Sequence, residues 1–273
     1  MALRPPIPPL RPFVEAIWSL DERAVSGDAV RREHVLPTGR MHLVVRLGDD
    51  PLRLFQHDDD RAGQVVATAL VGGARASYYV REVSRPLCSV GATLLPGAAF
   101  ALFGARADEL AARHTPLEDL WSAREVDVLR DRLATARSHA ERLDVFETTL
   151  AARLPRIHGL HPAVAHVLHD LRAFRPVHEA VQRSGYSHRA LIGLFAGAVG
   201  LTPKRYARVR RFHGALRRAV PDASWADIAA DLGYSDQAHF VREFREFAGV
   251  TPSGYRRAAP RFAHHVPVAP GPR

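Results

Sequence analysis

The C-terminal third of the chain contains the same pattern of residues twice. The first copy consists of Gly185-Tyr186-Ser187, then Phe195, then Gly200-Leu201-Thr202-Pro203 and Tyr206. The second copy consists of Gly233-Tyr234-Ser235, then Phe244, then Gly249-Val250-Thr251-Pro252 and Tyr255. The copies lie 48 residues apart at the first glycine and 49 apart from the phenylalanine onward, so the second carries one extra residue. A repeat of this kind predicts two structural units with the same fold.

The second copy predicts two helices joined by a tight turn. The i, i+3, i+4, i+7 spacing that forms one helical face is present at Trp225, Ile228, Ala229 and Leu232. Ser224 is placed to cap this helix, with Asp227 three residues later as in a capping box, and Gly233 suits its left-handed end. We expect Ser235 to cap a second helix over residues 236–247. A helix, a short turn and a second helix form the helix-turn-helix motif, which places its second helix in the major groove of DNA.

The first copy repeats this arrangement, with a helix around Val177, Ala180 and Val181 and a second helix that begins after Ser187. Between the copies, residues 203–219 form one predicted helix, rich in arginine, whose apolar residues lie at helical spacing. This linker helix would hold the two units at a fixed distance. We expect the second helix of each unit to enter successive major grooves, roughly 34 Å apart on one side of the duplex.

The excess of basic residues lies in the half of the chain that contains the repeat. Residues 156–273 contain 18 Lys or Arg and 8 Asp or Glu, whereas residues 1–155 contain 20 and 21. The C-terminal half therefore carries all of the formal net charge of +9. Since phosphate groups attract such a surface, the charge distribution independently favours double-stranded DNA as the partner.

The repeat and the linker also resemble a known family. The residues that carry the resemblance are Ile228-Ala229, Gly233-Tyr234-Ser235-Asp236-Gln237-Ala238-His239-Phe240, Phe244, Gly249-Val250-Thr251-Pro252-Ser253-Gly254-Tyr255-Arg256, and Pro203-Lys204-Arg205-Tyr206 in the linker. From about Val177 to Arg257, a third of the chain, they resemble the DNA-binding domain of the AraC family of bacterial transcription regulators. The resemblance implies a cytoplasmic, nucleoid-associated regulator that binds promoter DNA, with RNA polymerase as a further partner.

In the second unit, the residues expected to face DNA are Asp236, Gln237, Ala238, Val241, Arg242 and Arg245. Gln237 can pair with adenine through two hydrogen bonds and Arg242 with guanine, each worth on the order of 1–3 kcal/mol of discrimination. Lys204 and Arg208 of the linker helix are also expected to contact DNA. His239 and Glu243 lie further round the helix and are weaker candidates for base contacts.

The first unit is unusual. The exposed positions of its second helix are His188, Arg189, Ala190, Ile192 and Gly193. The AraC family usually has polar or arginine residues where Ile192 and Gly193 stand, and a glycine costs a helix about 1 kcal/mol relative to alanine. Three hypotheses remain: this unit binds bases weakly through His188 and Arg189, it contacts mainly the DNA backbone, or it only supports the second unit by packing.

The N-terminal half predicts strands followed by helices. The predicted strands are Met41–Leu47, Val65–Val71, Tyr78–Val83 and Cys88–Leu94, with a turn at Asp58-Asp59-Asp60. The predicted helices are Ala98–Phe103, Ala107–Arg113, Val126–Arg137 and His139–Leu154. The fold class is therefore α+β, with a small β-sandwich or barrel and a helical connector before the all-α double helix-turn-helix domain. We place the domains at 1–155 and 156–262, with a hinge at Pro155–Pro162 and a flexible tail over 263–273.

This half also resembles an N-terminal domain that is found fused to AraC-type regulators. The residues that carry the resemblance are Leu36-Pro37-Thr38-Gly39-Arg40-Met41-His42-Leu43, Gly72-Gly73, Leu95-Pro96-Gly97-Ala98-Ala99-Phe100 and Pro116-Leu117-Glu118-Asp119-Leu120-Trp121. The resemblance implies sensing or dimerisation and names no ligand. Two alternatives remain: the domain binds a small-molecule effector, or it is purely a dimerisation or protein-contact module. A hollow, partly polar pocket would favour the first, and a packed interior with an exposed apolar face the second.

Catalytic and metal functions have little support. His34, His42 and His57 match no compact ligand spacing, and Cys88, the only cysteine, lies in an apolar strand where a thiol is usually inert. We expect no enzyme activity, cofactor or metal. No apolar run approaches the ~20 residues of a membrane span, and Met1 to Pro12 lacks the organisation of a signal peptide. The sequence therefore predicts a cytoplasmic protein with no membrane partner.

Overall fold

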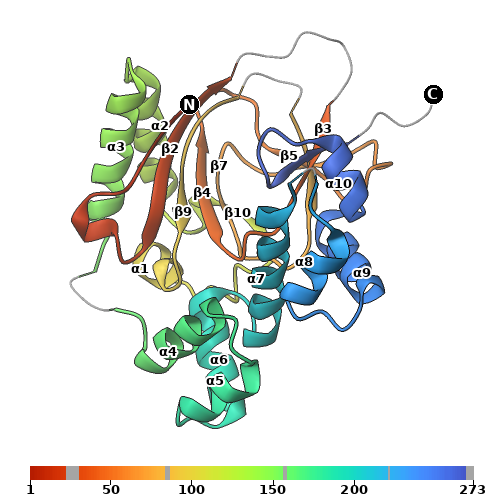
Figure 1. Ribbon diagram of the computed structural model, residues 1–273. Coiled ribbons are helices and arrows are strands. Elements are labelled where there is room, and N and C mark those ends of the chain that lie inside the picture. The colour runs from red at the N-terminus through yellow and green to blue at the C-terminus, as the bar shows by residue number, and fades with distance from the viewer. Residues whose placement is uncertain (23–30, 84–86, 156–158, 221, 269–273) are drawn as a thin grey trace.

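A β-rich N-terminal half lies beside a helical C-terminal half in the computed structural model (Figure 1). The structure describes residues 1–22, 31–83, 87–155, 159–220 and 222–268. The predicted α+β fold class is confirmed, because two antiparallel sheets precede an all-helical segment.

Two sheets form the N-terminal half. The strands are β1 (Ala2–Arg4), β2 (Val14–Glu22), β3 (Arg32–Val35), β4 (Met41–Arg46), β5 (Arg53–Phe55), β6 (Gln64–Val65), β7 (Ala69–Gly72), β8 (Tyr79–Glu82), β9 (Leu87–Leu94), β10 (His114–Pro116) and β11 (His265–Pro267). The larger sheet has the order β1-β2-β9-β4-β7-β10, and the smaller has the order β11-β3-β8-β5-β6. Neighbouring strands are antiparallel throughout the described residues.

Ten α-helices accompany the sheets within the described ranges. In the N-terminal half they are α1 (Ala98–Phe103), α2 (Ala123–Thr135) and α3 (His139–Ala152), with short 3₁₀ turns at Pro8–Leu10 and Leu117–Asp119. In the C-terminal half they are α4 (Pro162–Arg172), α5 (Val177–Arg183), α6 (His188–Val199), α7 (Pro203–Arg218), α8 (Trp225–Asp231), α9 (Gln237–Ala248) and α10 (Pro252–Ala258). The prediction of a linker helix over residues 203–219 is confirmed by α7.

The alternation of buried residues along β4 explains how the larger sheet packs. Met41, Leu43 and Val45 are buried, whereas the residues between them are half-exposed. Successive side chains point to opposite faces of a strand, so one face of this sheet joins the core. Helix α3 packs on β2 and β9, and Figure 1 shows α2 and α3 together on this side of the sheet.

Two predictions for the N-terminal half are wrong. The single strand expected at Val65–Val71 is two strands in different sheets, because the chain crosses from β6 to β7. The helix expected at Ala107–Arg113 is a series of turns. There Ala112 N donates to Ala74 O at 3.0 Å and Arg113 O accepts from Gly73 N at 2.9 Å. Part of the backbone thus bonds to the residues that follow β7, and the remaining local bonds form only single turns such as Ala111 N to Asp108 O. Strands β2 and β3 were not predicted.

The prediction of a flexible tail is wrong for residues 263–268. Strand β11 pairs with β3 in the N-terminal half, and Val266 at its centre is 1% exposed. Two further backbone bonds flank the strand, from Leu36 N to His264 O at 2.8 Å and from Val268 N to Arg32 O at 2.9 Å. An unpaired edge of the smaller sheet thus gains a partner. Residues 269–273, and residues 156–158 of the predicted hinge, lie outside the described residues, and the domain boundaries stay a proposal.

Candidate nucleic-acid interface

The first repeat folds as a helix-turn-helix unit of α5 and α6. Gly185, in the turn, has a φ of 73°, the left-handed conformation expected there. Ser187 caps α6 as predicted, because its hydroxyl accepts from Ala190 N at 3.3 Å. Leu191 and Phe195 of α6 are buried. The N-terminal end of this helix is therefore solvent-exposed while its apolar face is held in the core.

The second repeat folds in the same way from α8 and α9, with one correction. Ser224 caps α8 and Gly233 has a φ of 72°, as predicted. The cap of α9 is Asp236, one residue later than predicted, and its carboxylate accepts from His239 N at 2.6 Å. This backbone hydrogen bond lowers the pKa of Asp236. The carboxylate therefore serves the helix end, and a DNA contact by Asp236 stays a prediction.

Buried Glu243 fastens α9 to α7. Its side chain is 3% exposed and accepts from Arg208 Nε at 2.7 Å, from Arg211 at 3.5 Å and from the Tyr234 hydroxyl at 2.9 Å. Arg208 also forms an ion pair with Glu246. The linker helix α7 and helix α9 are thus joined by charged hydrogen bonds. The guanidinium of Arg208, which we predicted to contact DNA, is paired within the protein.

The remaining predicted residues of α9 face solvent. Gln237, Ala238, Arg242 and Arg245 are exposed, and Val241 is half-buried. Within the described part of the chain, the side chains of Gln237, Arg242 and Arg245 form no hydrogen bond or ion pair. The exposed face of α9 thus carries two cations and one amide, which are the groups that bind phosphates and base edges.

Helix α6 of the first unit exposes fewer polar side chains than α9. His188, Arg189 and Ala190 are exposed at its N-terminal end, as is Lys204 at the start of α7. Ile192 is half-buried. Gly193 is exposed, but its carbonyl accepts from Arg106 of the N-terminal half at 3.2 Å. This contact was missed from the sequence. Gly197, where a Cβ atom would lie 2.8 Å from the guanidinium of Arg106, was the signal in the sequence that another group approaches the helix closely.

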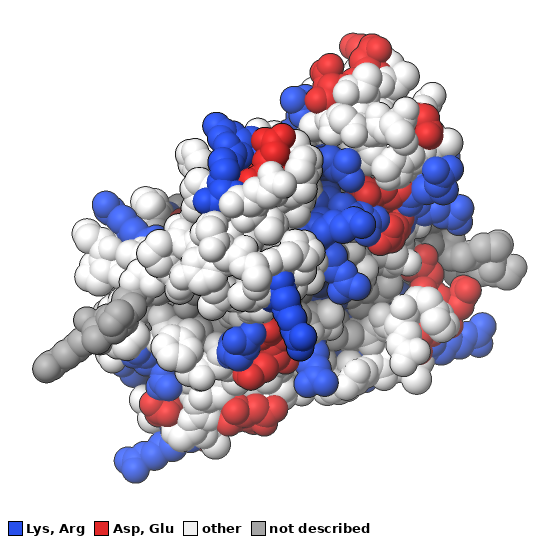
Figure 2. Space-filling view, turned by 90° about the horizontal axis from the view of Figure 1, so that it is seen from below, with Lys and Arg blue, Asp and Glu red and all other residues white. Residues whose placement is uncertain are grey.

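Charges of both signs are mixed on the surface. Figure 2, which views the molecule from below, shows Lys and Arg interspersed with Asp and Glu, without a continuous basic area on that face. Ion pairs account for part of this: Asp170, buried, faces Arg175 at 3.4 Å and Arg183 at 3.1 Å. The net charge of the C-terminal half therefore overstates the number of cations free to meet DNA.

Two of the histidines considered as metal ligands form hydrogen bonds with other groups. His34 is bonded to Asp58 and Ala248, and His42 to the Thr38 hydroxyl. Among the described residues, no three side chains of the metal-ligating types converge on one point. Burial raises the pKa of the half-buried Cys88 thiol, whose sulfur accepts from Arg142 at 3.4 Å, and the reactive thiolate is disfavoured.

Two known domains match the sequence. Residues 180–258 match the family described as "Helix-turn-helix domain", and residues 3–116 match a domain of unknown function, DUF6597. The first match covers both repeats and α7. No helix in the described ranges is long and apolar enough to span a membrane.

Curated relatives are similar over the same C-terminal region. A probable transcription factor, PqrA of Proteus vulgaris, is 37% identical over 27% of this chain and 62% of its own length. An uncharacterized HTH-type transcriptional regulator, YtdP of Bacillus subtilis, is 28% identical over 34% of this chain and 12% of its own length. The chain thus spans less than two thirds of these relatives. A crystal structure of an apo ToxT variant from Vibrio cholerae matches over 88% of this chain and 95% of its own, with 10% identity and a TM-score of 0.45.

Proposed function

Because residues 180–258 form an AraC-type helix-turn-helix domain, we propose that the protein is a transcription regulator that reads promoter DNA with α6 and α9. The observation that carries the proposal is the paired geometry. Two units of the same fold present the exposed N-terminal ends of their second helices, and one helix, α7, joins them. A DNA-binding regulator of this kind would act in the cytoplasm, at the nucleoid.

The chemistry of each reading helix supports different contacts. In α9, Gln237 suits adenine and Arg242 guanine, while Val241 and Ala238 suit a thymine methyl group. Arg245 and Lys204 are exposed cations without an ion pair in the described ranges, and they suit phosphates. In α6, only His188 and Arg189 offer polar groups at the exposed end. We therefore propose that α9 supplies most of the base discrimination and that α6 contributes mainly backbone contacts.

The test is binding of the purified protein to DNA fragments that flank its own coding region, across a salt series. Arg242→Ala removes a proposed base contact. Arg124→Ala is the matched control, because Arg124 is an exposed arginine of α2 in the other half of the molecule. We expect saturable binding to one fragment that weakens steeply with salt, with Arg242→Ala weaker by about 10- to 100-fold on that fragment only. Equal, weak binding of all three proteins to every fragment would refute sequence-specific recognition.

The N-terminal domain carries a polar cluster that bears on its role. The rings of Tyr79 in β8 and His114 in β10 lie 4.5 Å apart and so link the two sheets. The guanidinium of Arg75 lies 4.4 Å from the centre of the Tyr79 ring and donates to His114 Nδ1 at 3.2 Å. Burial lowers the pKa of Arg75, and this side chain has no carboxylate partner within the described residues. A half-buried cation without a counter-charge is costly.

This cluster favours the effector hypothesis over a pure protein-contact module, and we propose that the effector is a small anion. Thermal unfolding with acetate, benzoate and decanoate, each against chloride, provides the test. A carboxylate should raise the Tm of the wild type but not of Arg75→Met, which keeps an unbranched side chain over Tyr79. An unchanged Tm with all three, together with concentration-dependent dimerisation in ultracentrifugation, would support the alternative. Contact with RNA polymerase is part of the same proposal.

A further inference from the structure

The N-terminal domain completes the C-terminal end of the first reading helix. The last carbonyls of any α-helix lack partners within the helix. In α6, Gly200 N donates to Ala196 O, which satisfies one of them. Ala107 N donates to Gly197 O at 2.8 Å and Gly97 N donates to Ala198 O at 2.8 Å. Two backbone amides from the N-terminal half therefore cap a helix that belongs to the DNA-binding domain.

Arg106 adds a side-chain clasp to this cap. Its guanidinium is held by Asp108, with Nε–Oδ1 at 3.0 Å and a second bond at 2.7 Å, and it donates to Gly193 O at 3.2 Å. A Cβ atom at Gly197 would lie only 2.8 Å from the guanidinium carbon. Gly197 thus leaves α6 bare where the Arg106 guanidinium lies against it, whereas a Cβ atom at Gly193 would meet no atom within 4 Å. The glycine at position 197 is explained by this contact, and Gly193 contributes to it only through its carbonyl.

The second reading helix is held at the corresponding end. His34 of β3 donates from Nδ1 to the carbonyl of Ala248, the last residue of α9, at 2.9 Å. The other ring nitrogen of His34 bonds to Asp58 at 2.6 Å, which fixes the ring. A Cβ atom at Gly249 would lie 2.5 Å from His34 and 2.7 Å from Tyr78. The pairing of β11 with β3 fastens the chain again just after this unit.

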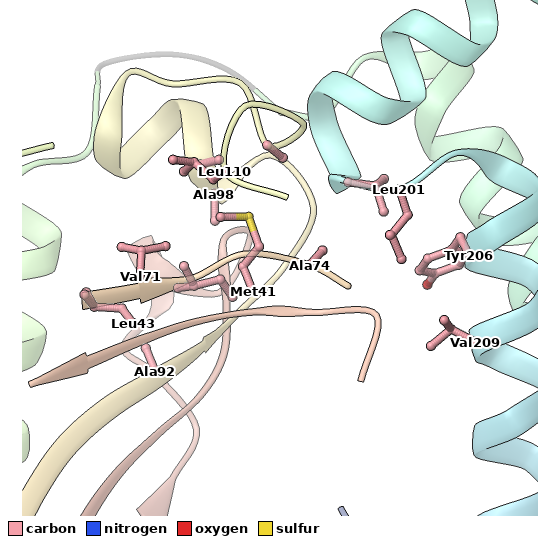
Figure 3. Packing of buried hydrophobic residues seen from close by; sticks show 14 of the residues in the cluster. Met41, Leu43, Val71, Ala74, Ala92, Ala98, Leu110, Leu201, Tyr206 and Val209 are labelled. Carbon is pink, nitrogen blue, oxygen red and sulfur yellow. The ribbon is translucent and has the colours of Figure 1, made fainter. Parts of the chain in front are cut away.

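The linker helix is held between these two attachments. His213 of α7 donates to Pro37 O at 2.8 Å. Figure 3 shows Tyr206 and Val209 pointing from α7 toward the β-rich half, and they share one buried core with Ala74 of that half. The N-terminal domain therefore contacts both reading helices at their C-terminal ends and contacts the helix between them. The exposed N-terminal ends, which carry Arg189 and Gln237, stay free.

We propose that the N-terminal domain sets the spacing between the two DNA half-sites, with Arg106 as a positioning residue for α6. The three attachments fix the distance and the relative rotation of the reading helices. A DNA with one base pair more or less between its half-sites then rotates one site by about a tenth of a turn relative to the other. This inference rests on the proposed function, because it assigns a determinant of DNA specificity.

The spacing test uses DNA selected by the wild-type protein. Affinity is measured at the selected distance between the half-sites and with one base pair added or removed between them. Arg106→Glu removes the guanidinium and puts a carboxylate beside Asp108 and the Gly193 carbonyl. The negative groups repel one another, so the clasp is lost. Arg113→Glu is the matched control, since Arg113 is an exposed arginine seven residues away whose side chain forms no hydrogen bond or ion pair with α6 among the described residues. We expect wild type and Arg113→Glu to lose at least tenfold in affinity on either change of spacing, and Arg106→Glu less than threefold. Because each protein is compared with itself, the lost charge cancels from the ratio.

A second variant removes the clasp without changing charge. Gly197→Ala adds a Cβ that displaces the guanidinium of Arg106, while alanine favours the helix. Gly197→Ala should show the same tolerance of altered spacing. A folded Arg106→Glu and Gly197→Ala that keep the full spacing penalty of the wild type would overturn the proposal.

Hydrogen exchange of α6 separates failure of this inference from failure of the proposed function. If the wild type recognises no specific DNA, the proposed function fails, and exchange without DNA still tests the attachment. Arg106→Glu should speed exchange of the α6 backbone amides, while Arg113→Glu leaves them unchanged. Unchanged exchange of α6 in Arg106→Glu would show that the clasp does not position the helix.

Discussion

Replacement of Glu243 tests how the linker helix is joined to the second reading helix. The carboxylate, 3% exposed, accepts from Tyr234, Arg208 and Arg211. Glu243→Ala would leave the buried Tyr234 hydroxyl without its acceptor and two guanidinium groups without their shared counter-charge. Removal of one partner from a buried ion pair costs about 3–5 kcal/mol. Glu243→Gln keeps an oxygen that accepts from Tyr234, so we expect a loss of about 1–3 kcal/mol.

The measurement is equilibrium unfolding in urea of the full chain, followed by circular dichroism and tryptophan fluorescence. Trp225 packs against Phe240 and Phe244 and so reports on the second unit. Glu246→Ala is the matched control, because Glu246 pairs with the same Arg208 but is 52% exposed. An exposed ion pair is worth less than about 1 kcal/mol, and the control should lose no more. Equal losses for Glu243→Ala and Glu246→Ala would refute the claim that a buried carboxylate joins α7 to α9.

The cap of α9, two buried histidines and strand β11 can each be tested through protein stability. Asp236→Ala should lower the free energy of unfolding by about 1 kcal/mol and Ser235→Ala by much less, since Asp236 is the cap of α9; equal effects in urea unfolding would contradict this assignment. Burial lowers the pKa of His213 to about 4 and of His264 to about 3, below the ordinary value near 6.5. Stability is therefore fully present above pH 6.5 and should fall from there toward pH 4, by at most about 1.4 kcal/mol per pH unit for each imidazole; a Tm that stays constant over this range would count against their burial. A chain that ends at residue 262 lacks β11 and should unfold at a lower temperature than the full chain, whereas an unchanged Tm would mean that this strand contributes no stability.

The helical half was predicted closely because its signals are local. Serine, threonine and proline at helix starts and glycine at helix ends act within one turn of chain, so Ser187, Ser224 and Thr251 could be placed from sequence alone. The cap of α9 was misplaced by one residue because Ser235 and Asp236 are adjacent and both suit the role. The choice between them depends on which side chain reaches His239 N in the folded turn.

The errors in the N-terminal half have a different cause. An apolar run such as Val65–Val71 is compatible with one strand or with two, and only pairing across the sheets separates β6 from β7. The segment Ala107–Arg113 has helical composition, but Gly73 and Ala74 supply partners for its backbone. Strand β11 looked like a tail because its pairing partner, β3, lies more than 200 residues earlier in the chain.

Residue types and their spacing were enough to predict two helix-turn-helix units, the start of α6, and which half of the chain carries the positive charge. These properties depend on residue type and on spacing within a few turns of helix. Which cations remain available depends on the fold, because only the folded chain brings Glu243 and Glu246 beside Arg208 and leaves Arg242 without an ion pair among the described residues. The tertiary structure also decided that the N-terminal domain caps both reading helices, since the partners in those contacts, Ala107 with Gly197 and His34 with Ala248, meet only when the whole chain has folded.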